Sequence, residues 1–139
     1  MEKYKKSAVV ILVNSKKQIL LHLRDNKPGI LAPGHWAFIG GGVEEKESEL
    51  EAIRREVKEE INILIENFFY LDKIYFKSYN LMVSVYIGRL DIPGEEIKVN
   101  EGQGVKFFYP DEIKKIKMSK ILKRIITKNL NKILSIVEN

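Results

Sequence analysis

The segment from Gly40 to Ile63, GGGVEEKESELEAIRREVKEEINI, joins three consecutive glycines to eight glutamates. The whole chain carries a formal charge of +5, so this concentration of acid stands apart from the rest. Like charges at helical spacing repel one another and destabilise a helix. A fold that contains this segment must therefore either leave the carboxylates in water or use them together.

One amphipathic helix is predicted between Ser48 and Asn62. Ser48 followed by Glu51 forms the S-x-x-E capping-box pattern, which begins helices. Asn62 can adopt the left-handed conformation that ends a helix. The apolar residues between them recur at spacings of three and four, at Leu50, Ile53, Val57 and Ile61. One side of this helix is therefore expected to pack on a hydrophobic core.

Three glutamates share one flank of the predicted helix. With Val57 at zero and about 100° per residue, Glu60 falls at about −60°, Glu56 at about −100° and Glu59 at about −160°. The two arginines of the helix lie at other angles. Hard cations such as Mg²⁺ and Mn²⁺ take several oxygen ligands, so this flank predicts a divalent metal site. A solvated acidic surface is the alternative explanation.

Strand patterns surround this helix, and a helical region follows them. Residues rich in β-branched and aromatic types predict strands at 6–13, 19–24, 36–39, 68–76, 81–90 and 105–109. Two Pro-Gly pairs make 25–36 a loop, and 91–104 is a polar loop with room for a short strand. Pro110 opens a short helix, and Ser119 caps a final helix whose apolar side reaches Val137. This order predicts an α/β fold in which helices cover a mixed sheet.

Length and composition indicate the class of protein. With 139 residues, 45% hydrophobic and 31% charged, the chain is expected to form one soluble domain over 1–139. It contains no cysteine, which excludes disulfides and thiolate metal sites and is typical of a cytoplasmic protein. The apolar run from Ala8 to Val13 is too short for a signal peptide or a membrane span, so no membrane attachment is expected.

Positive charge is concentrated in residues 113–139, the basic tail. The tail has eight lysines and arginines and one acid, Glu138, so it carries +7 and residues 1–112 carry −2. One interpretation is the solvated face of an amphipathic helix. The other is a surface that attracts polyphosphate or nucleic acid.

The glycines, the acidic helix and their spacing together resemble the signature of the Nudix hydrolase family. Gly41 is followed after five residues by Glu47, and after seven more by REVKEEINI at 55–63. The family pattern is G-x5-E-x7-R-E-U-x-E-E-x-G-U, where U is apolar. A fixed spacing over 23 residues is far more specific than a lone glycine motif. Asn62 stands where the family has glycine, and asparagine is the next-best residue for a left-handed helix end.

The resemblance implies a Nudix-type α/β/α sandwich with a mixed sheet, and it implies a role for each matching residue. The metal ligands for Mg²⁺ or Mn²⁺ would be the Gly40 carbonyl and the carboxylates of Glu56, Glu59 and Glu60. Arg55 would orient Glu56, since a guanidinium fork suits a carboxylate. Gly41 and Glu47 would hold the geometry of the loop and helix.

The stretch Glu101-Gly102-Gln103 resembles the late acidic loop of the branch that removes oxidised guanine nucleotides. There a glutamate contacts metal or acts as the general base. Glu101 is therefore the first candidate for general base, on a loop expected to be mobile, and Glu59 is the second.

Arg24 and Trp36 are candidates for binding the phosphate or the nucleobase of a substrate; a surface arginine and a core tryptophan are the alternatives. The two histidines are expected to be structural or surface residues.

Nudix enzymes hydrolyse a nucleoside diphosphate linked to another group, X. Metal ions neutralise the diphosphate and lower the pKa of a bound water, and a carboxylate accepts the proton. The resemblance predicts a nucleoside triphosphate, oxidised or not, as substrate, with a nucleoside monophosphate and pyrophosphate as products. The alternatives are a dinucleoside polyphosphate, a nucleotide sugar or the 5′ end of an RNA. A non-enzymatic RNA- or nucleotide-binding module that uses the basic tail is a second class.

Overall fold

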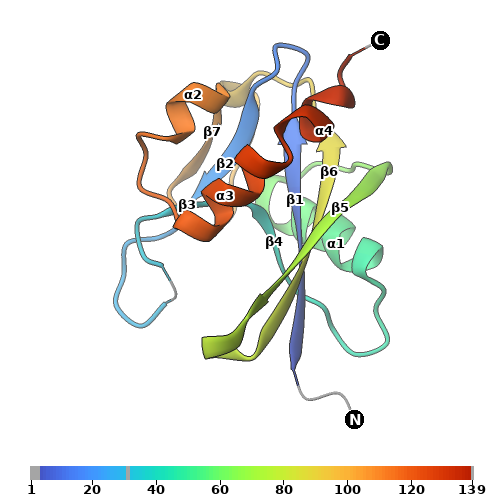
Figure 1. The fold of residues 1–139 in the computed structure, drawn as a ribbon, viewed down its shortest axis with the longest axis vertical. Helices are drawn as coiled ribbons and strands as arrows, with labels where there is room; N and C mark the ends of the chain where they lie inside the picture. The colour runs from blue at the N-terminus through green and yellow to red at the C-terminus, as the bar shows by residue number, and fades with distance from the viewer. Residues whose placement is uncertain (1–3, 31, 139) are drawn as a thin grey trace.

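The apolar run that begins at Ala8 becomes the central strand of a mixed sheet (Figure 1). The computed structural model describes residues 4–30 and 32–138. Within them the strands are β1 (Lys5–Val13), β2 (Ile19–Leu23), β3 (Trp36–Ala37), β4 (Ile39–Gly42), β5 (Phe68–Phe76), β6 (Leu81–Arg89) and β7 (Gly104–Phe108). The helices are α1 (Glu49–Ile61), α2 (Pro110–Ile113), α3 (Lys120–Lys128) and α4 (Leu130–Ser135), with 3₁₀ turns η1 (Lys77–Tyr79) and η2 (Gly94–Glu96).

Strand β1 organises the sheet because it pairs with three other strands. It runs parallel to β6 along its whole length and antiparallel to β2 and β4. Strand β5 extends the sheet beyond β6, and both β3 and β7 pair with β2. A parallel pair requires a long crossover, and here α1 lies within the connection between β1 and β6. The mixed sheet expected from the sequence is confirmed.

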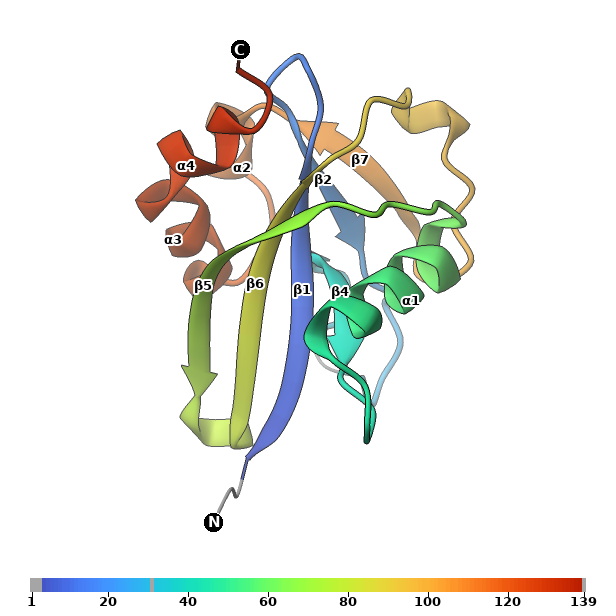
Figure 2. The same ribbon diagram turned by 90° about the vertical axis from the view of Figure 1, so that its right-hand side faces the viewer.

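Helices cover both faces of the sheet, as Figure 2 shows, with α1 on one side and α2, α3 and α4 on the other. Side chains alternate along β1, so Val10 and Leu12 pack toward Ile53 and Val57 of α1. Ile11 and Val13 point the opposite way and belong to the core that contains Ile125, Ile126 and Ile133 of α3 and α4. Strands buried on both faces read as continuous apolar runs, which explains the sequence of β1.

Helix α1 has the ends that the sequence predicts. The Ser48 hydroxyl accepts a hydrogen bond from the Glu51 backbone, and the Glu51 side chain accepts one from the Ser48 backbone. Asn62 ends the helix in the left-handed conformation, with φ 60° and ψ 30°. No helix in residues 4–30 and 32–138 is long and apolar enough to cross a membrane.

Two predicted elements are divided in the structure. The strand expected at 36–39 is two short strands, because β3 pairs with β2 whereas β4 pairs with β1 and continues through Gly42. The single helix expected after Ser119 is α3 followed by α4, since Asn129 leaves the helical conformation (φ −112°, ψ 18°). The Asn129 side chain donates a hydrogen bond to Asp72 of β5. The loop after β6 contains the turn η2 in place of the short strand that it had room for.

A substitution at Gly40 tests whether β4 must approach β1 as closely as the structure shows. Its φ is +145°, and a methyl group there would meet the Ala8 carbonyl oxygen and lie 2.6 Å from the Val9 Cα atom. We expect Gly40→Ala to lower the free energy of unfolding by about 2 kcal/mol or more, because neither backbone can give way. Gly42→Ala is the matched control, since a methyl group there has nothing within 4 Å. Urea unfolding with a chelator present measures both, and equal losses would contradict the close approach.

Candidate active site

Two of the three glutamates on the flank of α1 converge on the loop that precedes β7. Figure 2 shows this loop beside the C-terminal end of α1. Glu56 and Glu60 lie close to each other, and Glu101 of the loop lies close enough for its charge to raise the pKa of both. Glu60 is buried, with 5% of its surface exposed, whereas Glu101 is exposed. The structure therefore brings together carboxylates from a helix and a distant loop.

Glu59 lies toward the solvent side of this cluster. Its side chain is 52% exposed, and one of its oxygens accepts a hydrogen bond from Arg55 Nη1 at 3.3 Å. Its charge still contributes to raising the pKa of Glu56. The helical wheel therefore placed the three carboxylates on the correct flank, but it could not show that only two of them turn inward.

The backbone of the glycines in β4 contacts the carboxylates of Glu56 and Glu60. The Gly40 N–H donates a hydrogen bond to Glu60 Oε2 at 3.2 Å. A methyl group on Gly41 would collide with the Glu56 carboxylate, whose carbon atom would be only 2.9 Å away. Glycine at 41 thus allows Glu56 to rest directly against the backbone.

Arg55 holds Glu47 more tightly than it holds Glu56. It donates to both Glu47 oxygens, from Nε at 2.8 Å and from Nη2 at 3.0 Å, and its contact with Glu56 is longer, at 3.3 Å. It also donates to the Gly42 carbonyl at 3.0 Å. The hydrogen bonds from Arg55 lower the pKa of Glu47 from 4.5 to about 2. Arg55 therefore fastens the loop after β4 to α1, and it touches Glu56 from that fixed position.

The two inward carboxylates are costly to ionise together. Burial, followed by the nearby Glu56 carboxylate, raises the pKa of Glu60 from 4.5 to about 8, and the hydrogen bond from Gly40 opposes the rise. Burial is also the main cause that raises the pKa of Glu56, with Arg55 acting in the opposite direction. Two carboxylates in this position need either a proton or a cation.

The donor set fits a hard divalent cation by its chemistry. Among residues 4–30 and 32–138, no three His, Asp or Glu side chains converge tightly enough to hold a metal ion as they stand. However, Glu56 and Glu60 offer oxygen ligands of the kind that Mg²⁺ and Mn²⁺ prefer, and their mutual repulsion is the energy that such a cation would relieve. Arg55, the cation beside them, has its shortest contacts with Glu47.

His22 is a site residue that the sequence did not identify. It is buried in β2, and its Nε2 donates to the Glu101 backbone carbonyl at 2.7 Å, because a carbonyl can only accept. Its Nδ1 lies 3.7 Å from Glu60 Oε1. The signal in the sequence that could have identified His22 is that it is a single histidine within the otherwise apolar strand ILLHL. The role of His22 stays a prediction; the structure shows that it is buried and that its ring contacts both Glu60 and the loop residue Glu101.

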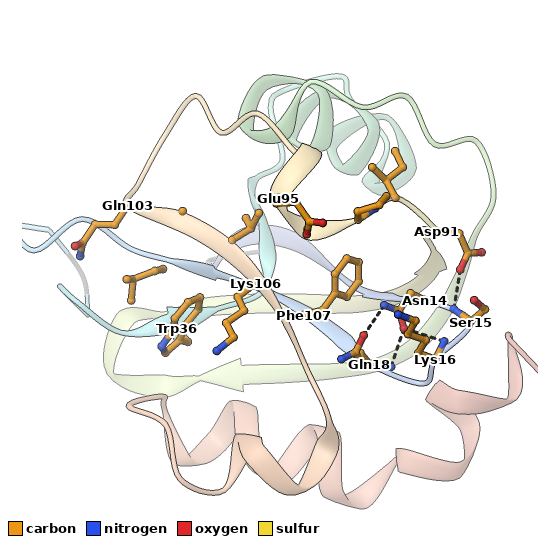
Figure 3. Close-up of a pocket in the computed structure, with 16 residues that line it drawn as sticks. Asn14, Ser15, Lys16, Gln18, Trp36, Asp91, Glu95, Gln103, Lys106 and Phe107 are labelled. Atoms are coloured by element: carbon orange, nitrogen blue, oxygen red, sulfur yellow. Dashed lines mark hydrogen bonds between the residues drawn. The ribbon is translucent and has the colours of Figure 1, made fainter.

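A groove of about 800 Å³ runs along β7 (Figure 3), and Gln103, two residues after Glu101 in the chain, is among the residues that line it. Trp36 and Gln103 lie at one end and Asn14 and Asp91 at the other, with Lys106 between them. Trp36 packs edge-to-face on Phe108, with 4.8 Å between the ring centres, so it both joins the core and lines the groove. Arg24 is half-buried and does not line the groove, although its carbonyl accepts a hydrogen bond from Gln103.

Fold and site together define an α/β/α protein in which carboxylates of α1 lie close to Glu101 of the loop before β7, next to the glycines of β4. The family model described as "NUDIX domain" matches residues 3–129. The chain therefore belongs to the Nudix family, as the spacing of residues 41–63 had suggested.

Curated relatives match part of the chain. The nucleoside triphosphatase NudI of Salmonella agona (strain SL483) is 45% identical over 51 residues, which are 37% of this chain and 35% of the relative. The RNA pyrophosphohydrolase of Ruthia magnifica subsp. Calyptogena magnifica is 35% identical over 72 residues, which are 52% of this chain and 37% of the relative. This chain thus spans little more than a third of the length of these relatives.

Solved structures share the fold over most of the chain. A MutT protein from Methanosarcina mazei Go1 superimposes with a TM-score of 0.82 at 20% identity, covering 94% of this chain and 96% of that chain. An Ap4A hydrolase from C. elegans superimposes with a TM-score of 0.70 at 23% identity, covering 88% and 93%. At these identities the likeness concerns the fold alone.

Arg55 should be more important for stability than its neighbour Arg54. Arg55→Ala leaves the carboxylates of Glu47, Glu56 and Glu59 without their shared cation. We expect a loss of about 1.5–3 kcal/mol in the free energy of unfolding, together with lower activity. Arg54→Ala is the control, because Arg54 donates only to the Glu66 carbonyl among the contacts that the structure records. Chemical unfolding measures both variants, and an Arg55→Ala protein as stable as the Arg54→Ala protein would contradict this role.

Glu60 should make the metal-free protein less stable as the pH rises. The unfolded chain loses this proton near its ordinary pKa of 4.5 and the folded protein keeps it until about 8, so stability falls across that interval. In the presence of a chelator, Glu60→Gln should therefore melt above the wild type at pH 8 and close to it at pH 4.5. Melting curves across this range test the effect, with the exposed Glu45→Gln as control. A difference that is constant with pH would contradict the burial of an ionisable Glu60.

Proposed function

We propose that the chain is a metal-dependent hydrolase of nucleoside diphosphates linked to a group X, and that X is the pyrophosphate of a nucleoside triphosphate. The products would be a nucleoside monophosphate and pyrophosphate. The observation that carries the proposal is the convergence of Glu56 and Glu60 on Glu101 above the Gly40 strand. Carboxylates that repel one another at a single point are suited to binding cations and polyphosphate together.

The metal ligands in this proposal are the Gly40 carbonyl and the carboxylates of Glu56, Glu59 and Glu60. When bound, Mg²⁺ or Mn²⁺ would neutralise the diphosphate and lower the pKa of a water molecule. Gly41 leaves the space in which Glu56 reaches its position, and Glu47 with Arg55 keeps the β4–α1 loop in place.

Glu101 is proposed as the general base. The attacking water gives its proton to the Glu101 carboxylate while its oxygen bonds to phosphorus and the bridging P–O bond breaks. Glu101 is exposed and comes from a different element than the metal ligands, so its carboxylate is available to accept a proton. Glu59 is the second candidate, but Arg55 contacts it.

The groove along β7 is proposed to receive the nucleoside. Trp36 lines the groove at the same end as Gln103 and has an aromatic face suited to stacking on a base. Arg24 is proposed to contact phosphate, since it precedes the loop that leads to Trp36. The names of the relatives, nucleoside triphosphatase and RNA pyrophosphohydrolase, support a substrate with a triphosphate group, either on a free nucleotide or at the end of an RNA.

A screen of nucleotides tests the substrate. Canonical and oxidised nucleoside triphosphates, a dinucleoside polyphosphate, a nucleotide sugar and a 5′-triphosphorylated RNA are each incubated with Mg²⁺, and both products are identified. Release of pyrophosphate and a monophosphate from a free triphosphate is the expected result. Faster turnover of the RNA than of any free nucleotide would contradict a free nucleoside triphosphate as the substrate and favour the 5′ end of an RNA. Binding of RNA without hydrolysis of any compound would contradict the enzyme and favour a binding module.

Glu101→Gln should lower kcat by about a hundredfold and leave KM within about threefold, because a missing proton acceptor affects the chemical step and not binding. Glu96→Gln, an exposed residue of the turn η2 in the same connection that does not line the groove, is the matched control and should retain kcat. Steady-state kinetics at several pH values measures both variants. Equal behaviour of the two would move the base to Glu59.

A further inference from the structure

Asn62 does more in this chain than glycine does at the same position of the family pattern. Its backbone takes the left-handed conformation that glycine would take. Its side chain, which glycine lacks, makes two hydrogen bonds to the loop before β7. Asn62 Nδ2 donates to the Lys98 carbonyl at 2.9 Å, and Asn62 Oδ1 accepts from Asn100 Nδ2 at 2.9 Å.

Asn100 attaches the same loop to the end of α1. Its backbone N–H donates to the Glu60 carbonyl at 2.8 Å, and its Nδ2 also donates to the Glu59 carbonyl at 2.8 Å. Carbonyls in the last turn of a helix have no partner within the helix, so these two are available to the loop. The loop is thus bonded directly to the residues whose carboxylates form the site.

The other end of the loop is bonded to strand β2. Gln103 donates from its backbone to the Leu23 carbonyl at 2.9 Å and from its side chain to the Arg24 carbonyl at 2.8 Å. Between the two attachments, His22 donates to the carbonyl of Glu101 itself. Gly102, in the loop that the sequence was expected to make mobile, is packed so closely on His22 that a methyl group would collide with its ring. Glu101 itself is exposed, on a backbone that these hydrogen bonds hold on both sides.

We propose that Asn62 and Asn100 are positioning residues that hold Glu101 above Glu56 and Glu60. The position at which this chain departs from the family pattern thereby becomes part of the machinery that places the proton acceptor. The proposal rests on the proposed function in one respect, namely that Glu101 is the general base. The alternative is that Asn62 only ends the helix, in which case its side chain would be dispensable.

The variant Asn62→Gly separates these two roles. Glycine adopts the left-handed conformation readily, so the helix end is kept while both side-chain hydrogen bonds are lost. Asn80→Gly is the matched control, because Asn80 also lies in the left-handed region (φ 48°) but is in the turn between β5 and β6, where it accepts from Tyr75. Asn100→Ala is a second variant that removes the contact from the other side.

Hydrogen exchange measured by mass spectrometry reports the attachment without reference to activity. We expect peptides covering residues 98–103 to exchange at least about fivefold faster in Asn62→Gly and in Asn100→Ala than in the wild type, because local opening sets the exchange rate. The Asn80→Gly protein should be unchanged in this region. Unchanged exchange at 98–103 in both loop variants would overturn the proposal and leave the proposed function intact.

A double-mutant cycle reports the positioning role. We expect Asn62→Gly to lower kcat about tenfold with KM for the nucleotide nearly unchanged, since displacement of a catalytic group by about 1 Å can cost that much or more. In the Glu101→Gln background the same substitution should have little effect, because both changes act through one carboxylate. Equal losses in the two backgrounds would overturn the positioning role. A Glu101→Gln protein with full activity would contradict the general base in the proposed function and the positioning role with it.

Discussion

The repulsion between the carboxylates of Glu56 and Glu60 is the constraint to which the rest of the site is fitted. Burial, and after it the nearby Glu56 carboxylate, raises the pKa of Glu60 to about 8, so two charges are unfavourable at this position. Several surrounding features reduce that cost, including the backbone N–H of Gly40 and the guanidinium of Arg55. None of them removes it, so the cluster retains a cost that either a proton or a cation would offset.

Helix α1 supports this cluster because it is fixed at both ends. At its N-terminal end Glu49 accepts hydrogen bonds from the Ser84 hydroxyl at 2.8 Å and the Tyr86 hydroxyl at 2.7 Å, both on β6. At its C-terminal end Asn62 and the last carbonyls bind the loop that carries Glu101. The apolar side between these ends packs on the sheet. A helix held in this way can keep charged groups close together, because they cannot relax by tilting the helix.

The proposed function assigns chemistry and substrate choice to different elements. The carboxylates come from α1 and the loop before β7, whereas the groove is formed by β7, Trp36 and the turns at the far end of the sheet. Gln103 links the two, since it lines the groove and is only two residues from Glu101. In that proposal, the reaction follows from the family pattern at residues 41–63, whereas the identity of X depends on side chains outside that pattern.

The sequence by itself determined the elements whose cause is local. The ends of α1 follow from Ser48, Glu51 and Asn62, and the buried strand β1 follows from an unbroken apolar run. Tertiary structure decided what depends on distant neighbours. The split of residues 36–42 between two partner strands, and the break at Asn129 beside Asp72, arise from pairing across the sheet. Likewise, spacing placed three glutamates on one flank, but only the packing of α1 against β4 and the loop buried Glu60, exposed Glu59 and brought in His22, since those contacts join residues far apart in the chain.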